Sequence, residues 1–308
     1  MSIKKDILNL DGFEIKDIKE LLVQTDSFAE ILKRDIKKVP ALRGKTIINL
    51  FFEPSTRTKV SFEIASKRLS ADLINFAPST SSLKKGETEI DTLKTINAMK
   101  VDLIIIRHSD SGYINYFAKE MPVPVINAGD GKHEHPTQAL LDLYTIFKNF
   151  SDFKGLKVAI VGDILNSRVA RSDIKLFKKM GMDVTVVAPS MLIPENFDFF
   201  DVKITSSIDD VISKVDILYM LRMQFERQDK KIYPSIQEYN RFLSLNLPRL
   251  DLMKKDSIIL HPGPVNRGIE ISDEIMEMEN ILDNRIKINT QVTNGVAVRM
   301  AVLYYALS

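Results

Sequence analysis

Three hydroxyls and a guanidinium occur together in this sequence, at Ser55, Thr56, Arg57 and Thr58. They follow an apolar run at 46–52 and precede a segment with helical spacing, so we expect them at the start of a helix. A helix start offers free N–H groups and partial positive charge, and an arginine adds a bidentate fork. The cluster therefore predicts a phosphate site, although the glycine pattern of a P-loop is absent. The alternative is that Ser55 only caps the helix and Arg57 is a solvated surface residue.

A second group of polar residues could polarise a carbonyl. Arg107 ends the apolar run at 103–107, where taken alone it would favour a structural role. His135 precedes Pro136 at an expected helix start, and Gln138 lies one turn in. The positive helix end should lower the pKa of His135 and keep it a neutral donor. A zinc site at His133 and His135 is poorly supported, because the chain has no cysteine and no third ligand is suitably spaced.

The second half of the chain offers groups that suit carboxylates. Arg168 follows a β-branched run, and Arg222 and Gln224 follow another. Only Gly162 is present where a dinucleotide fingerprint would need three glycines, so we exclude a nicotinamide site. The turn at 261–264 is rigid and could aim backbone carbonyls at a ligand. With no Ser–His–Asp set and no paired catalytic carboxylates, the constellation predicts transfer from an activated phosphate compound to an acidic acceptor.

Short apolar runs alternate with helical segments, which predicts an α/β protein with parallel sheets flanked by helices. One helix is expected to bury Val60, Ile64, Ala65 and Leu69. Ligands of such sheets bind beyond the carboxyl ends of the strands. The polar segment at 149–157 is the expected seam between two domains. The expected strands lie at 46–52, 73–77, 103–107, 123–128, 157–162, 183–188, 202–206, 216–221 and 257–261.

Composition narrows the function further. The 308 residues carry a formal charge of +2, which does not suggest nucleic-acid binding. No apolar run approaches the roughly 18 residues needed to cross a membrane, and the N-terminus lacks the apolar core of a signal peptide. The absence of cysteine fits a reducing compartment. We therefore expect a soluble cytoplasmic protein.

The ordered motifs resemble the transcarbamylase family, and within it the catalytic chains of the aspartate branch. The resemblance runs from about residue 45 to the C-terminus. The matching pieces are "FFEPSTRTKVSFE", "SSLKKGETEIDT", "RHSDSG", "HEHPTQALLDLYTI", "VGDILNSRVARS", "DILYMLRMQFER" and "HPGPVNRGIEI".

The resemblance implies a fold and a reaction. The fold is a two-domain transcarbamylase, with residues 1–148 binding carbamoyl phosphate and 149–290 binding L-aspartate. The last helix, 291–308, returns to the first domain. The amine of aspartate would attack the carbamoyl carbonyl, giving N-carbamoyl-L-aspartate and phosphate in the committed step of pyrimidine biosynthesis. No cofactor or metal is implied.

The resemblance also implies roles for individual residues. Those expected to hold the phosphate are Ser55, Thr56, Arg57 and Thr58. Those expected to polarise the carbonyl are Thr58, Arg107 and His135. The carbamoyl amide would be positioned by Gln138 and by the backbone carbonyls of Pro262 and Gly263; some members have a larger apolar residue in place of this glycine. Aspartate would be bound by Arg168, Arg222, Gln224 and Lys85.

Ser81 and Lys85 are expected to reach into the site of a neighbouring subunit, which implies a homotrimer with shared active sites. The loop would otherwise be interpreted as mobile surface. The sequence leaves open whether regulatory chains, nucleotides or a dihydroorotase partner act on such trimers, and whether the donor is channelled. Two alternative functions differ from this one in residues they would be expected to carry. An ornithine-type enzyme typically carries a cysteine near 261–264, and this chain has none; a non-catalytic scaffold would be expected to have lost a site residue.

Overall fold

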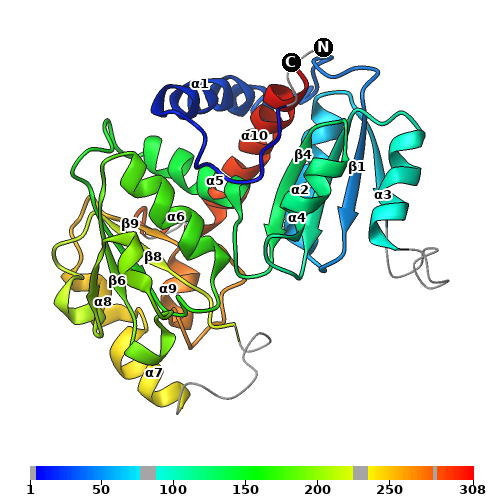
Figure 1. The fold of residues 1–308 in the computed structure, drawn as a ribbon. Helices are drawn as coiled ribbons and strands as arrows, with labels where there is room; N and C mark the ends of the chain where they lie inside the picture. Colours follow the sequence, from blue (N-terminus) through cyan, green and yellow to red (C-terminus); the bar gives the residue numbers. More distant parts are fainter. Residues whose placement is uncertain (1–4, 77–87, 225–234, 280–282) are drawn as a thin grey trace. The chain divides into compact units, whose positions relative to one another are not determined.

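The structure is a computed structural model that describes residues 5–76, 88–224, 235–279 and 283–308. The chain divides into two compact units (Figure 1). Unit 1 comprises Met1–Tyr144 and Thr293–Ser308, and unit 2 comprises Thr145–Val292.

Unit 1 is built on a four-stranded parallel sheet in the order β2-β1-β3-β4. Strands β1, β3 and β4 are almost entirely buried, as expected for a sheet covered on both faces, whereas the edge strand β2 is largely exposed. The strands are β1 (Thr46–Phe51), β2 (Asp72–Phe76), β3 (Leu103–His108) and β4 (Val125–Asp130).

The helices of unit 1 alternate with its strands along the chain. They are α1 (Ile15–Leu32), α2 (Thr56–Arg68), α3 (Glu89–Ala98), α4 (Tyr113–Glu120), α5 (Pro136–Phe147) and α10 (Ile288–Leu307), of which α5 and α10 continue across the unit boundary. The two ends of the described chain lie side by side (Figure 1), where Lys5 Nζ donates to the Ser308 carbonyl at 3.1 Å.

The buried face of α2 differs from the predicted one. Ala65 and Leu69 are buried as expected, but Val60 is 44% exposed and Ile64 is 36% exposed. Phe62, which the predicted stripe omitted, is fully buried. The face of α2 that carries Phe62 therefore packs on the core. Burying this aromatic ring removes more apolar surface from water than burying Val60 or Ile64 would.

Unit 2 is built on a five-stranded parallel sheet in the order β7-β6-β5-β8-β9. The strands are β5 (Lys157–Val161), β6 (Asp183–Val187), β7 (Lys203–Thr205), β8 (Ile217–Met220) and β9 (Ile258–Leu260). Its helices are α6 (Arg168–Lys179), α7 (Ile236–Leu243), α8 (Leu247–Leu252) and α9 (Asp273–Met278), with three short 3₁₀ helices at Ser190–Leu192, Phe197–Phe200 and Ile208–Asp210.

The predicted fold class is confirmed. Every strand expected from the sequence is present within the described residues, with bounds shifted by a residue or two, and every strand pairing is parallel. No helix in the described part of the chain is long and apolar enough to cross a membrane. In each sheet the carboxyl ends of the strands lead into the polar loops that the sequence singled out, which is where parallel sheets bind ligands.

Candidate active site

The start of α2 presents the hydroxyl cluster of unit 1. Ser55 is the N-cap residue, but its side chain makes no capping hydrogen bond, so side-chain capping does not account for it. Thr56 and Arg57 are exposed in the first turn, and Thr58 is buried behind them. The first turn holds no acidic side chain, so its N–H groups and Arg57 form a positively polarised surface. This end of the helix can bind an anion.

Arg107 connects the carboxyl ends of three strands. It lies at the end of β3, opposite Phe51 of β1, and its carbonyl accepts from Phe52 N at 2.9 Å. Its buried guanidinium donates to Glu53 Oε2 at 3.0 Å and, on β4, to the Ala128 carbonyl at 3.2 Å. Arg107 is therefore held rigidly beside the loop that leads into α2, and its charge is offset by Glu53.

The loop between β4 and α5 is folded around the buried carboxylate of Asp130. This carboxylate accepts from Gly112 N at 2.7 Å, from Glu134 N and Asn127 Nδ2 at 3.0 Å, and contacts His133 Nδ1 at 3.0 Å. Burial raises the pKa of Asp130, but these hydrogen bonds outweigh it and hold the pKa below its usual value. An ionised Asp130 thus fixes the turn that leads to His135.

His135 and Gln138 lie at the start of α5, and both are buried. The carbonyl of His135 accepts from the backbone N–H groups of Gln138 and Ala139, at 3.0 and 3.2 Å. The side chain of Gln138 donates through Nε2 to both oxygens of Asp142, at 3.1 Å each. The first turn of α5 therefore has a fixed backbone and a fixed amide.

In unit 1, the loops after β1, β3 and β4 are hydrogen-bonded to one another through Arg107 and Asp130 or their neighbours. They assemble two helix starts with a buried arginine between strand ends, which can bind a phosphate and polarise a carbonyl. No group of three or more histidine and acidic side chains that could hold a metal occurs among the described residues. The zinc hypothesis for His133 and His135 gains no support.

In unit 2, Arg168 is the first residue of α6 and is buried. The helix is capped by Ser167, whose hydroxyl accepts from Ala170 N at 3.1 Å. The preceding Gly162 has a φ of +124°, and a Cβ there would lie 2.8 Å from Tyr239 Oη. Glycine is therefore needed for this close approach, and not for a dinucleotide.

Arg222 and Gln224 follow β8, which pairs with β5, so their loop lies beside the loop that leads to Arg168. Buried Asp163 connects the two loops: it accepts from Gln224 N at 3.3 Å and from Asn166 Nδ2 at 3.0 Å. The Arg222 and Gln224 side chains are half-buried. Arg168 and Arg222 thus lie on connections that follow two neighbouring strands, an arrangement that can bind a dicarboxylate.

A second buried carboxylate, Glu270, joins the loop after β8 to the loop after β9. It accepts from Met223 N, Asn266 N and Asn266 Nδ2, all at 2.7 Å. Burial raises the pKa of Glu270 to about 7, although these three hydrogen bonds act in the opposite direction. In the same loop His261 Nδ1 accepts from Gly263 N at 2.8 Å, which orients the predicted turn.

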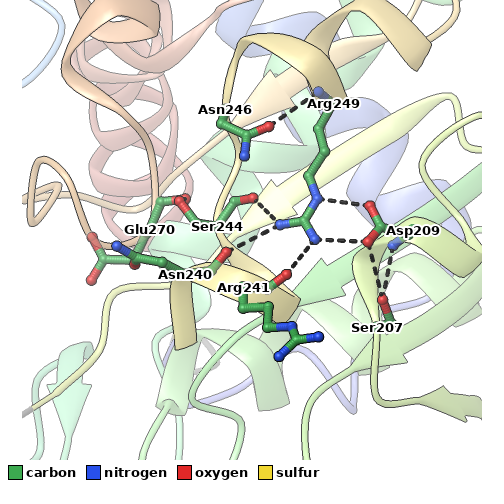
Figure 2. A network of polar contacts seen from close by, with 8 residues as sticks. All are labelled: Ser207, Asp209, Asn240, Arg241, Ser244, Asn246, Arg249 and Glu270. Carbon is green, nitrogen blue, oxygen red and sulfur yellow. Dashed lines mark hydrogen bonds and ion pairs between the residues drawn. The ribbon is translucent and has the colours of Figure 1, made fainter. Parts of the chain in front are cut away.

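The segment that carries Glu270 is held in turn by Arg249 (Figure 2). The buried Arg249 side chain donates to both oxygens of Asp209, at 2.7 and 2.8 Å. It also donates to carbonyls at the C-terminal end of α7, namely Asn240, Arg241 and Ser244. Leu245 N then donates to the Glu270 carbonyl at 2.8 Å. One guanidinium therefore satisfies carbonyls that the end of α7 leaves open.

Ser81 and Lys85 lie outside the described residues. Several residues that build the loops were missed by the sequence interpretation: Glu53, Asp130, Asp142, Asp163 and Glu270. Asp163 could have been found, because it directly follows a strand and a required glycine. Glu270 carries no local signal, since its partners lie on two other loops.

The fold and these loops define a class of protein: a two-unit α/β enzyme with an anion site on one parallel sheet and an arginine-lined site on the other. Two family models match the chain. The carbamoyl-phosphate-binding domain of aspartate/ornithine carbamoyltransferase matches residues 5–148, and the Asp/Orn-binding domain matches residues 154–306. The chain therefore belongs to the aspartate/ornithine carbamoyltransferase family.

Similar sequences include the aspartate carbamoyltransferase catalytic subunits of Endomicrobium trichonymphae and Syntrophus aciditrophicus. The first is 50% identical, covering 97% of this chain and 94% of the relative; the second is 51% identical, covering 98% and 96%. The aspartate transcarbamoylase of Trypanosoma cruzi, solved with N-(phosphonacetyl)-L-aspartic acid, is similar in structure. Its TM-score is 0.89 at 31% identity, covering 99% of this chain and 96% of that one.

Proposed function

We propose that this chain is the catalytic chain of an aspartate carbamoyltransferase. It transfers the carbamoyl group of carbamoyl phosphate to L-aspartate, in the committed step of pyrimidine biosynthesis. The observation that carries the proposal is that one chain has a positively polarised helix start in unit 1 and, in unit 2, Arg168 and Arg222 on connections that follow neighbouring strands. The names of the similar proteins support the same donor and acceptor.

The donor is assigned to unit 1. The backbone and side chains of residues 55–58 bind the phosphate, and Arg57 neutralises the charge that grows as phosphate leaves. Thr58, Arg107 and His135 donate to the carbamoyl oxygen, which becomes an oxyanion in the tetrahedral intermediate. Because Arg107 is already held by Glu53 and Ala128, little reorganisation is needed at that step.

The acceptor is assigned to unit 2. Arg168, Arg222 and Gln224 bind the two carboxylates of aspartate, and Pro262 and Gly263 offer carbonyls to the carbamoyl amide. The amine attacks the carbamoyl carbon, a C–N bond forms, the C–O bond to phosphate breaks and the amine loses a proton. Catalysis comes from positioning and from stabilised charge, with no covalent enzyme intermediate. We assign the donor domain to 1–148 with 291–308, and the acceptor domain to 149–290.

The acceptor decides between this function and the ornithine-type alternative. Ornithine would bring a cationic side chain towards arginines, which is costly at short range. N-carbamoyl product should therefore form from aspartate with a kcat/KM higher than that for ornithine by about three orders of magnitude. The assay measures product from both amino acids side by side. Comparable rates would contradict the aspartate assignment.

We further propose a homotrimer whose active sites are completed by Ser81 and Lys85 of a neighbouring subunit. Exposed apolar residues support a subunit contact on α2 and β2: Val60, Ile64 and Ile74. Mass measurement in solution tests the trimer. Mixing inactive Lys85→Ala chains with inactive His135→Ala chains tests sharing, since exchanged trimers should regain activity at some sites. Confirmed hybrids without activity would place the loop in its own subunit's site.

We also expect the enzyme to act in the cytoplasm, because a chain without cysteine fits a reducing compartment. Fractionation of cells followed by the activity assay tests this expectation. Activity confined to another fraction would contradict it.

A further inference from the structure

Two buried charged residues of unit 1, Asp142 and Arg299, interact electrostatically, and Asp142 also contacts the glutamine assigned to the carbamoyl group. Asp142 follows Gln138 by one turn of α5 and is fully buried, and Arg299 of α10 is 4% exposed. Neither residue has a part in the proposed reaction. Buried charges are costly unless they are paired and hydrogen-bonded, so their retention at this place needs an explanation.

Asp142 determines which way the Gln138 amide faces. Gln138 Nε2 lies 3.1 Å from Asp142 Oδ1 and 3.1 Å from Asp142 Oδ2. A carboxylate offers only acceptors, so the donor end of the amide must face it and the oxygen must face away. The reversed amide would place three oxygens together in a buried site. The carboxylate thereby removes the usual ambiguity between the two orientations of a glutamine side chain.

Arg299 is a buried cation of the same unit. Burial lowers the pKa of Arg299 to about 10, and the negative charge of Asp142 acts in the opposite direction. The guanidinium is therefore a cation at neutral pH. Arg299 Nη1 also donates to Ser61 Oγ at 3.0 Å, and its guanidinium lies 5.2 Å from the centre of the Phe62 ring. It thus connects α10 to α2, the helix whose start is assigned to the phosphate.

We propose that Asp142 is a positioning residue that sets the donor specificity of this enzyme through Gln138. The fixed amide offers the donor an acceptor oxygen, which suits the NH₂ of a carbamoyl group. An acyl phosphate with a methyl group in place of NH₂ would leave that oxygen unsatisfied in a buried site. The inference rests on the proposed function, because it concerns the group that binds the carbamoyl amide.

The test compares three probes: carbamoyl phosphate, acetyl phosphate and inorganic phosphate. In Asp142→Asn, residue 142 offers one donor and one acceptor, so either orientation of the Gln138 amide can be hydrogen-bonded. We expect binding of carbamoyl phosphate to weaken about 10-fold, while the Kd of inorganic phosphate stays within about twofold. The preference for carbamoyl over acetyl phosphate should fall by a similar factor. A parallel loss for carbamoyl phosphate and inorganic phosphate would overturn the inference, because it would indicate general damage to α5.

A double-variant comparison separates positioning from a structural effect. If Asp142 acts through Gln138, then Gln138→Ala with Asp142→Asn should bind carbamoyl phosphate no more weakly than Gln138→Ala alone. Additive losses would overturn the inference. The matched control is Asp26→Asn, since Asp26 also bonds α5, but through Tyr144, whose Oη donates to it at 2.7 Å six residues beyond Gln138. The control should leave the preference between the two donors unchanged.

If Asp142→Asn does not fold, Asp142→Asn with Arg299→Met removes both charges together and leaves no unpaired buried ion. It should show the same loss of preference for carbamoyl phosphate, and an unchanged preference would overturn the inference. The wild-type chain reports on the proposed function separately. Suppose that the wild type binds carbamoyl phosphate and forms N-carbamoyl-aspartate, but the Asp142 variant keeps the wild-type preference between the two donors. That result would contradict only the role of Asp142. A wild type that does not bind carbamoyl phosphate would overturn both.

Discussion

Each unit folds its binding loops around a buried carboxylate, Asp130 in unit 1 and Glu270 in unit 2, and the two carboxylates have opposite pKa shifts. Asp130 has four hydrogen-bond partners, one of which is His133, and its pKa is lowered. Glu270 accepts three short hydrogen bonds, yet burial raises its pKa to about 7. Asp130 should therefore stay ionised near neutrality, whereas Glu270 should change its charge there.

The units also differ in how their binding groups are spaced. The residues of unit 1 that we assign to the phosphate are consecutive, at 55–58 on one helix start. Those of unit 2 that we assign to the acceptor, Arg168, Arg222 and Gln224, come from two loops linked by Asp163, and Glu270 links the second of these to the loop after β9. Replacing a single contact residue of unit 1 should consequently be enough to reduce activity sharply. Unit 2 should also be sensitive to residues that never touch the substrate.

The largest effect is expected at Arg57. Arg57→Ala should reduce kcat/KM by about 10³-fold, because its contact with the leaving phosphate strengthens in the transition state. The fold should be retained, since Arg57 is exposed. Steady-state kinetics with carbamoyl phosphate measure the loss, and Arg43→Ala, at another exposed arginine of unit 1, is the matched control. Retention of more than a tenth of wild-type kcat/KM would contradict the assignment of Arg57 to the phosphate.

The next effect concerns Arg249, whose hydrogen bonds hold the end of α7 beside the segment that carries Glu270. Arg249→Met should lower the free energy of unfolding of unit 2 by about 3 kcal/mol, because it leaves Asp209 and three carbonyls without their donor. Denaturant unfolding followed by a probe in each unit measures the change. Arg241→Met, which changes an exposed side chain of α7, should lower the free energy of unfolding much less. Equal losses of unfolding free energy in the two variants would show that the hydrogen bonds of Arg249 do not stabilise unit 2.

A smaller effect is expected at Arg222. Arg222→Ala should raise the KM for aspartate by about 10- to 100-fold, since a charge-assisted pair is lost. The affinity for carbamoyl phosphate should change little, because that ligand is assigned to unit 1. Kinetics at saturating donor and a direct titration of carbamoyl phosphate separate the two. A loss of donor affinity in this variant would contradict the division of labour between the units.

The smallest effect is the pH dependence from Glu270. Its folded pKa of about 7 lies above its ordinary value of 4.5, so the folded state binds the proton more tightly. The resulting stabilisation is complete below about pH 4.5 and is lost as pH rises through 7. Between pH 6 and 8 the free energy of unfolding of unit 2 should therefore fall by about 1 kcal/mol.

Glu270→Gln serves as the comparison, since it removes the titrating group. Its unfolding free energy should depend less on pH over the same range than that of the wild type. Identical pH profiles for the two proteins would mean that Glu270 is already ionised throughout, as Asp130 is, and the contrast between the units would disappear.

The sequence predicted the strands and the fold class, because apolar β-branched runs and helical spacing are local signals that burial then satisfies. It also placed Ser55 at the start of a helix, since capping chemistry is local. The burial of Val60 and Ile64 was predicted wrongly. A helical stripe can be rotated to bury Phe62 instead, and only the surrounding packing decides between the two faces.

The sequence by itself predicted an anion site and carboxylate-binding arginines, because the residues concerned lie on the loops that follow strands of a parallel sheet. Tertiary structure alone decided how those groups are held. Asp130, Asp163 and Glu270 accept hydrogen bonds from loops that are separated in sequence. A carboxylate can link loops only when folding excludes water and brings hydrogen-bond donors to it, and no local sequence pattern indicates which donors those will be.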